Sequence, residues 1–328
     1  MSYLRYVLRR AAFAIASVYA IVTIAFVLGM TTIRSDIENA IAFAEYQGAN
    51  PAELARLERS LESTFGLDQP FLDSLVAWWI DVATFDWGYS SAFDEPILAV
   101  LDERVLHTLE YVVPGVVLAV LLGVLIGLYG ALRSDGFVDW TSRIVAYLLL
   151  GIPSFMVALY VLDLTGTTIG LPGGWVLVFV ELDDKTIAAL AVAAALLAGQ
   201  LRFARAAGLE QTGESYVKML RAKGVGRIRL ARHVFRNAAL PIVSLSITEL
   251  LTVLVLNIYV IERVLYIDGL ANVSLRAVGV VEGGSMTPVM ADVPLLVWSI
   301  MVIVFIGITL SFLQDVLQGY LDPRIGTE

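Results

Sequence analysis

The sequence of 328 residues contains no cysteine and only two histidines, His107 and His233. Without cysteine, disulfide bonds and thiol chemistry are excluded, and two histidines make a zinc site difficult to assemble. The sequence also lacks a Gly-x-x-x-x-Gly-Lys-Ser/Thr stretch, the phosphate-binding loop of many nucleotide hydrolases. No cluster of His, Asp and Glu stands at catalytic spacing. We therefore expect a chain without enzyme activity, resident cofactor or metal ion, and without a nucleic-acid partner.

Charge is scarce as well. Charged residues make up 16% of the chain, against about 25% in an average soluble protein, whereas hydrophobic residues make up 58%. A hydrocarbon core requires about 20 helical residues, and hydropathy places six spans in this chain. They lie at residues 10–30, 108–132, 142–164, 186–201, 238–261 and 293–313. The sequence therefore predicts an all-α integral membrane protein with six transmembrane helices.

The first of these runs has a second interpretation. Arg5, Arg9 and Arg10 precede it, as basic residues precede the core of a secretory signal peptide. Its apolar stretch of about 20 residues is longer than the roughly 7–15 of a cleavable core. The length favours an uncleaved span over a signal peptide.

The distribution of Lys and Arg predicts the orientation in the membrane. With the N-terminus inside, the inner segments hold 15 of these residues and the outer segments hold seven. Both termini are therefore expected in the cytoplasm of a multi-pass plasma-membrane protein. The expected parts are an N-terminal segment with the first span (1–30), an extracytoplasmic region (31–107) and a core of five spans (108–328) with a cytoplasmic loop at 202–237.

The extracytoplasmic region is expected to be folded and acidic. Asn50-Pro51-Ala52-Glu53 has the pattern of a helix start, and this helix should end near Gly66. Asp94-Glu95-Pro96 predicts another helix start, with Ile97, Val100 and Leu101 on one side. Trp78, Trp79 and Trp87 indicate amphipathic pieces at the outer membrane interface. Two roles stay open, a docking surface for an external partner and a cap that covers the spans.

This region also suggests a habitat. Residues 31–110 carry 15 acids against four bases, and only three of the 22 basic residues of the chain are Lys. We interpret the acidic outer surface as a sign of life at high salt. Normal function of the purified protein in dilute buffer would argue against this hypothesis.

Within the spans, polar and small residues mark candidate sites. Gly123, Gly127 and Gly130 have the spacing for close helix packing, which is preferred over a transport role. The break at Gly151-Ile-Pro153 is either a kink that lines a pathway or a plain bend. Glu249 lies deep in the fifth span, where a carboxylate must face protein or a wet cavity. It is either a pathway residue, which we favour, or a polar fastener between subunits. The candidate pathway residues are Pro153, Ser154, Ser246, Thr248, Glu249, Thr252 and Asn257.

The loop at 202–237 is the most distinctive stretch. Nine of the 22 Lys and Arg residues fall between Arg202 and Arg236. A short helix is predicted at 215–224, with Tyr216, Met219 and Leu220 on one exposed face that docks into a partner. Gly224 has the place of a left-handed C-cap. A basic stripe then follows at Arg229, Arg232, His233 and Arg236, until Pro241 marks the next span. The alternative for the stripe is ordinary positive-inside anchoring.

These motifs occur together in one known family. Tyr216-Val-Lys-Met-Leu-Arg-Ala-Lys-Gly224, followed by Arg232-His233-Val-Phe-Arg236-Asn237-Ala-Ala-Leu-Pro241, resembles the cytoplasmic "EAA" loop of ABC-importer permeases. More narrowly, the chain resembles the first of the two permease subunits of dipeptide, oligopeptide and nickel importers. Further matches are Arg9-Arg10, Phe65-Gly-Leu-Asp-Gln-Pro70, Asp86-Trp-Gly-Tyr-Ser90, Ile152-Pro-Ser-Phe155 and Leu321-Asp-Pro-Arg324. The resemblance follows the chain in order along nearly its whole length.

The resemblance implies a type I ABC importer transmembrane domain that moves peptides or a similar small solute. It implies four kinds of partner in the bilayer and around it: a second homologous permease, two ATP-binding-cassette ATPase subunits, an extracellular solute-binding protein and lipid. ATP hydrolysis would then take place in the separate ATPase subunits. The residues implied in coupling to the ATPases are Tyr216, Lys218, Met219, Leu220, Arg221, Ala222, Lys223, Gly224, Arg232, His233, Arg236, Asn237 and Pro241. The alternative function is an ion-coupled secondary transporter, for which internal repeats or paired broken helices would be expected.

Overall fold

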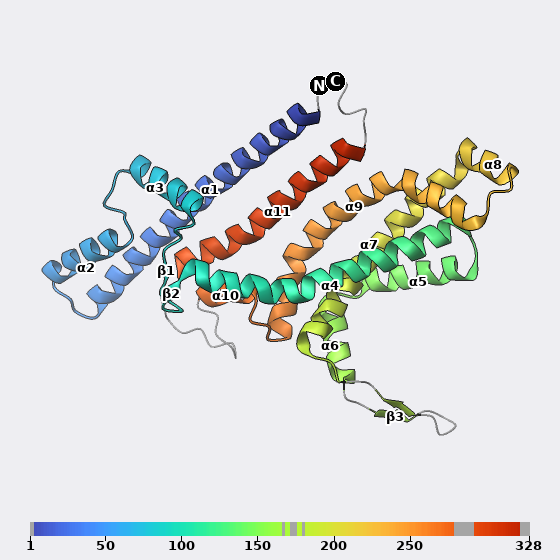
Figure 1. The fold of residues 1–328 in the computed structure, drawn as a ribbon. Helices are drawn as coiled ribbons and strands as arrows, with labels where there is room; N and C mark the ends of the chain where they lie inside the picture. The colour runs from blue at the N-terminus through green and yellow to red at the C-terminus, as the bar shows by residue number, and fades with distance from the viewer. Residues whose placement is uncertain (1–2, 166–167, 171–175, 179–180, 279–291, 322–328) are drawn as a thin grey trace. The chain divides into compact units, whose positions relative to one another are not determined.

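A computed structural model describes residues 3–165, 168–170, 176–178, 181–278 and 292–321 of the chain. The described residues are predominantly helical (Figure 1), as the composition predicted. The helices are α1 (Tyr3–Tyr46), α2 (Pro51–Thr64), α3 (Phe71–Thr84), α4 (Ile97–Leu132), α5 (Phe137–Gly151), α6 (Ser154–Leu164), α7 (Asp184–Gly213), α8 (Ser215–Ala222), α9 (Arg227–Val264), α10 (Leu270–Ala277) and α11 (Val293–Leu321). Two small antiparallel hairpins pair β1 (Tyr89–Ser90) with β2 (Glu95–Pro96) and β3 (Thr168–Gly170) with β4 (Val176–Val178).

The chain divides into two compact units, which are described separately. Unit 1 consists of Met1–Arg10, Leu106–Gly269 and Thr309–Glu328. Unit 2 consists of Ala11–Val105 and Leu270–Ile308. Helices α1, α4 and α11 each contribute a segment to both units.

Four described helices are long and apolar enough to cross a membrane, namely α1, α4, α7 and α11. A fifth candidate is the pair α5 and α6, which bends by 100° between its halves. The bend lies at Ile152 and Pro153, so the predicted break of the helix at Gly151-Ile-Pro153 is confirmed. The predicted fifth span, 238–261, lies within α9, which continues as one helix through Pro241. Helix α1 also continues well beyond the predicted end at residue 30.

Helix α7 is the centre of unit 1. It packs against α5, α6 and α9, and Ala and Gly residues make up much of its buried surface. Helix α4 approaches it closely at Gly115 and at two glycines of the predicted motif, where a Cβ atom at Gly123 would lie 2.5 Å from Gln200 Cβ and one at Gly127 would lie 2.6 Å from the Leu201 carbonyl oxygen. The packing interpretation of this glycine motif is therefore confirmed.

The core of unit 2 is built on stacked indoles. Trp298 lies parallel to Trp87 with ring centroids 4.5 Å apart, and Trp78 stacks on Trp298 at 4.7 Å. Trp87 and Trp298 are 8% and 1% exposed. Trp87 was expected at a wet interface, but the flat faces of the three rings bury more apolar area by stacking on each other. Trp79 is partly buried, and its Nε1 donates to the Thr23 hydroxyl at 3.1 Å.

The Asp86–Ser90 motif closes this core. Gly88 has a φ of +80°, and its carbonyl accepts the Ile97 N–H at 3.0 Å. The Ser90 hydroxyl donates to Asp292 Oδ2 at 2.7 Å, and the Ala92 N–H donates to the same oxygen at 3.0 Å. The other oxygen of Asp292 accepts the Leu295 N–H at the start of α11 (3.1 Å). One buried carboxylate therefore fixes the β1–β2 hairpin to the first turn of α11.

The predicted helix start at Asn50 is confirmed in full. The Asn50 side chain accepts the N–H groups of Ala52 and Glu53, and the Glu53 carboxylate accepts the Asn50 N–H, each at 3.0 Å. Helix α2 then ends at Thr64, two residues before Gly66. The second predicted start is one residue early, because Glu95 and Pro96 pair with β1 and α4 begins at Ile97. The predicted side of this helix, Ile97, Val100 and Leu101, is buried.

Candidate coupling and translocation sites

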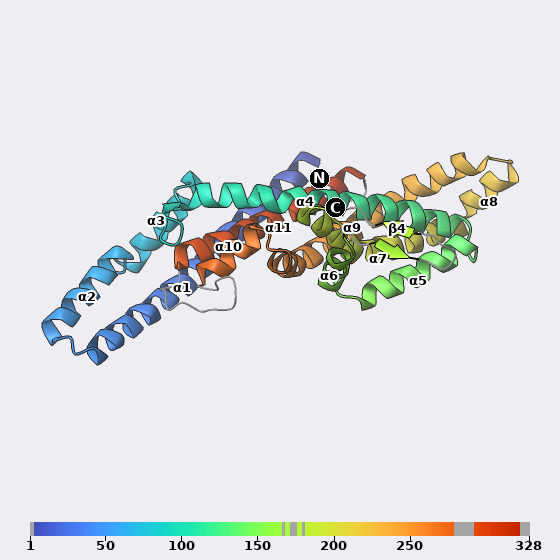
Figure 2. The ribbon, with the colours of Figure 1, turned by 90° about the horizontal axis from the view of Figure 1, so that it is seen from below.

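Helix α8 lies where the sequence predicts a short helix. It joins α7 to α9 and packs against both, and it lies at one end of these helices in two views (Figures 1 and 2). Its end is a Schellman motif, in which the Gly224 N–H donates to the Arg221 carbonyl (3.0 Å) and the Val225 N–H to the Leu220 carbonyl (3.1 Å). Gly224 has a φ of +71°, which side chains with a Cβ atom disfavour. The C-cap conformation predicted for Gly224 is confirmed.

Packing gives α8 a buried face and an exposed face. Val217 is fully buried in a cluster with Ala204 and Ala207 of α7 and Val234 of α9. Tyr216 and Leu220 pack against the same cluster. Of the three residues that were expected to form an exposed docking face, Met219 alone is exposed, at 50%. The other two face the chain itself, because an amphipathic helix turns its apolar side toward the nearest core.

The rest of the predicted coupling surface is exposed. On α8 this holds for Lys218, Arg221, Ala222, Lys223 and the following Gly224. On α9, every member of the basic stripe is exposed, while Leu230, Val234 and Ala238 point into the cluster with Val217. The exposed stripe and its neighbour consist of Arg229, Arg232, His233, Arg236 and Asn237. Pro241 lies inside α9 and is partly buried.

Arg205 is a basic residue of the same segment that turns inward. Its Nε donates to Asp139 Oδ1 at 2.5 Å, and its Nη2 donates to Asp139 Oδ2 at 3.0 Å. The Asp139 side chain is completely buried and also accepts the Asp135 N–H at 3.0 Å. On α4, Gly130 leaves room for it, since a Cβ there would lie 2.8 Å from Asp139 Oδ1. This pair joins the turn between α4 and α5 to α7, close to α8.

Sequence reasoning did not single out Asp139 or Arg205. The available signal was an acid in an inner segment, two residues after Phe137 opens α5, and the same segment also holds Asp135, Arg133 and Arg143. Its partner is 66 residues away in sequence. The pairing therefore depends on how α5 and α7 pack.

Glu249 is half-buried and accepts a hydrogen bond from a residue of α7. Gln200 Nε2 donates to Glu249 Oε2 at 2.7 Å, and the Ser246 hydroxyl donates to Gln200 Oε1. The Glu249 carboxylate lies directly over Gly199, where any side chain would collide with it. The structure thus brings Glu249 and Ser246 together through Gln200, a residue that the sequence analysis did not name.

The other predicted pathway residues lie at the bend and along α9. Pro153 precedes the first turn of α6, and the Ser154 hydroxyl donates to the Asn257 side-chain oxygen of α9. The Thr248 hydroxyl donates to the Ser244 carbonyl one turn earlier, at 3.0 Å. The side chain of Thr252 lies outside the described residues.

A second buried acid was also missed. Glu262, near the end of α9, is 0% exposed. Its Oε1 accepts hydrogen bonds from the Thr108 hydroxyl (2.6 Å) and the Tyr111 hydroxyl (3.0 Å) of α4. Gly269 admits this carboxylate, because a Cβ atom there would collide with Oε1. Glu262 therefore fastens α9 to α4 inside unit 1.

Comparison with known proteins gives one family. Residues 119–327 match the model of the "Binding-protein-dependent transport system inner membrane component" family, a range that contains α5–α9. The dipeptide transport system permease protein DppB of Bacillus subtilis is 26% identical over 324 residues, which cover 98% of this chain and 97% of the relative. The metal-staphylopine import system permease protein CntB of Staphylococcus aureus is 25% identical over 315 residues, covering 93% and 94%.

A putative peptide transport system permease protein of Brucella suis is similar to the same extent, at 26% identity over 326 residues, 97% of this chain and 98% of the relative. These similarities extend through both units, and the family model alone matches more than half of the chain. The chain therefore belongs to the binding-protein-dependent transport system inner membrane components, the multi-pass membrane permeases of ABC importers.

Proposed function

We propose that this chain forms half of the translocation pathway of a type I ABC importer for peptides or a similar small solute. The names of the dipeptide and metal-staphylopine permeases, which match nearly the whole chain, support this class of solute. The observation that carries the proposal is the packing of α8. Val217 holds α8 against α7 and α9, while the basic residues at its end are exposed.

The proposed topology has six spans with both termini in the cytoplasm. The spans are α1, α4, the bent pair α5–α6, α7, the 238–261 part of α9, and α11. The positive-inside rule supports this orientation, because 15 of the 22 Lys and Arg residues then lie on the inner side. In this arrangement α8 is cytoplasmic and most of residues 31–107 are extracytoplasmic.

The proposed complex contains a second homologous permease, two ATPase subunits and an extracellular solute-binding protein. The sequence has no phosphate-binding loop of its own, which supports an external source of energy. The exposed basic residues of α8 and α9, together with Met219, then form the surface that one ATPase subunit holds. The charged and apolar character of this surface suits a groove with an apolar floor and acidic edges.

Coupling follows from how α8 is anchored. When the ATPase dimer closes, it moves α8, and the packing of Val217 on Ala204 and Ala207 transmits the displacement to α7. The bidentate pair between Arg205 and Asp139 passes it to the α4–α5 turn and hence to the bent pair α5–α6. Because these contacts are buried, the elements move together rather than slide past each other. The spans then switch between inward-facing and outward-facing states.

The polar groups of α6, α7 and α9 are the proposed lining of the pathway. A carboxylate in a span is stable only against protein or water. Gln200 satisfies one oxygen of Glu249, the other oxygen lies over Gly199, and the partial exposure of Glu249 supports a place beside the pathway. Ser154 and Asn257 add a second polar contact beside the bend. Ser246, Thr248 and Thr252 lie on the same helix as Glu249.

The absence of cysteine makes the topology simple to test. Met219→Cys places one thiol on α8, and Phe85→Cys places one on a residue of unit 2 that is 60% exposed. A membrane-impermeant maleimide added to sealed vesicles should label the Met219→Cys protein only from the cytoplasmic side and the Phe85→Cys protein only from the outer side. Labelling of position 219 from the outside would refute the proposed coupling role. Copurification of the ATPases with the Met219→Cys protein, and their crosslinking to it, would support the role.

A further inference from the structure

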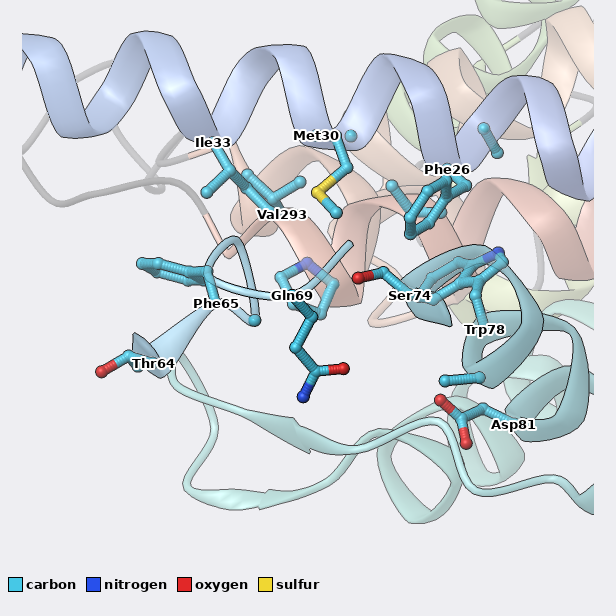
Figure 3. Close-up of a pocket in the computed structure, with 16 residues that line it drawn as sticks. Phe26, Met30, Ile33, Thr64, Phe65, Gln69, Ser74, Trp78, Asp81 and Val293 are labelled. Carbon is cyan, nitrogen blue, oxygen red and sulfur yellow. The ribbon is translucent and has the colours of Figure 1, made fainter. Parts of the chain in front are cut away.

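Unit 2 contains a pocket of about 310 Å³ that is separate from the proposed coupling and pathway residues. Figure 3 shows Phe26, Met30, Ile33 and Val293 along one side and Gln69, Ser74, Trp78 and Asp81 facing them. The walls are mainly apolar, and Asp81 is the one charged residue among the 16 that line the pocket. Its size is at the lower end of the range for small-molecule sites, about 300–1,000 Å³. The full lining is Ala25, Phe26, Gly29, Met30, Ile33, Thr64, Phe65, Gly66, Gln69, Ser74, Ala77, Trp78, Asp81, Val293, Pro294 and Val297.

The carboxylate of Asp81 stands where a negative charge is unfavourable. It is half-buried in the last turn of α3, where the helix dipole repels an anion. Burial first, and then the neighbouring Asp86 carboxylate, raise the pKa of Asp81 above its ordinary value. Within the part of the chain that the structure describes, no Lys or Arg forms an ion pair with it. A cation in the pocket would offset the unfavourable helix dipole, the burial of the charge and the repulsion by Asp86.

The aromatic walls favour the same kind of ligand. Phe26, Phe65 and Trp78 line the pocket, and the rings of Phe26 and Trp78 are 5.9 Å apart. Aromatic faces attract organic cations and also bury apolar groups. We propose that this pocket binds a small organic cation, an amine or guanidinium carried on an apolar body, with Asp81 as its counter-ion. The proposal concerns a site in unit 2 and does not depend on the solute that is transported.

A matched series of probes tests the proposal on the full chain in maltoside detergent. 2-Phenylethylamine, 2-phenylethanol and phenylacetate share one ring and differ in the charge of the end group. Binding is measured by calorimetry and by the tryptophan fluorescence of the chain, whose six tryptophans include Trp78 of the pocket lining. We expect the amine to bind at least tenfold more tightly than the alcohol and the acid not to bind. Equal affinity of the unchanged protein for the amine and the alcohol would by itself overturn the proposal.

Asp81→Asn and Asp73→Asn form a matched pair on one helix. Asp73 lies in the first turn of α3, where the dipole favours an anion, and it is not among the residues that line the pocket. Asp81→Asn should remove the preference for the amine and raise the melting temperature of the empty protein. Asp73→Asn should keep the preference and should not raise the melting temperature. An Asp81→Asn protein that still prefers the amine tenfold would also overturn the proposal.

Two sources of the cation are distinguished by competition. A short-chain phosphatidylethanolamine carries the same primary amine on a lipid. If it displaces 2-phenylethylamine, the natural occupant is an aminophospholipid, and if it does not, the site takes a free amine. Both results require the amine-selective site, whereas failure of the chain to support ATP-driven uptake would bear only on the proposed transport function.

Discussion

The bidentate pair between Asp139 and Arg205 gives the sharpest prediction, that Arg205→Ala strongly destabilises unit 1. The Asp139 side chain is 0% exposed, so the substitution leaves a buried carboxylate with one remaining near donor, the Asp135 N–H. Breaking a buried pair by removing one partner costs about 3–5 kcal/mol. The Arg205 side chain is 21% exposed, so its own desolvation is incomplete and the lower part of that range applies. We expect a loss of about 3 kcal/mol in the free energy of unfolding.

The assay is equilibrium unfolding of the purified chain in mixed micelles, carried out as a double-mutant cycle with Asp139→Asn. The single variants should be strongly non-additive, with a coupling energy of about 2 kcal/mol, because each already breaks the same pair. Arg143→Gln is the control. Arg143 also approaches Asp139, but at 3.9 Å and with 36% of its side chain exposed, so this variant should cost under about 1 kcal/mol. Equal effects of the Arg205 and Arg143 variants, or additive single variants, would refute this reasoning.

Three further predictions concern α8, the indole stack and the fifth span. Gly224→Ala should destabilise the end of α8 by about 1–2 kcal/mol, since the space around Gly224 is open and only its φ of +71° is unfavourable for a residue with a Cβ atom. Gly224→Pro should uncouple ATP turnover from uptake. Unchanged uptake per ATP in this variant would show that the coupling surface lies elsewhere. Trp298→Ala should cost about 3–5 kcal/mol in thermal unfolding, because the side chain is 1% exposed and stacked on two indoles; Trp140→Ala, at a residue that is 57% exposed, should cost under about 1 kcal/mol. Glu249→Gln should leave the amount of folded protein unchanged and alter the rate or solute preference of uptake, so that a variant with unchanged transport would exclude Glu249 from the pathway.

Local chemistry made several parts of the structure predictable. The capping box at Asn50 and Glu53 depends on residues three positions apart, so its hydrogen bonds are specified within one turn. The left-handed end at Gly224 and the bend at Pro153 likewise follow from the backbone preferences of single residues.

Which face of a helix is buried, and against what, was harder to predict than where the helix lies in the sequence. The periodicity of Tyr216, Met219 and Leu220 indicated an apolar face of α8 but not what covers it. The same periodicity is produced by a face that docks into a partner and by one that packs on the chain itself. The burial of Val217 against Ala204 and Val234 decided the matter for Tyr216 and Leu220. Trp78 and Trp87 show the same limit, because composition alone does not tell an indole at the membrane interface from one that stacks on another indole.

The sequence by itself determined the membrane class, the family motifs, the helix start at Asn50 and the left-handed helix end at Gly224, because hydropathy and capping act over a few residues. Only the tertiary structure decided which polar groups meet, such as Arg205 with Asp139 and Gln200 with Glu249, and that Asp81 is left beside an apolar pocket. These partners are 49 and 66 residues apart along the chain. Their pairing depends on the packing of whole helices, and no pattern within a single helix contains that information.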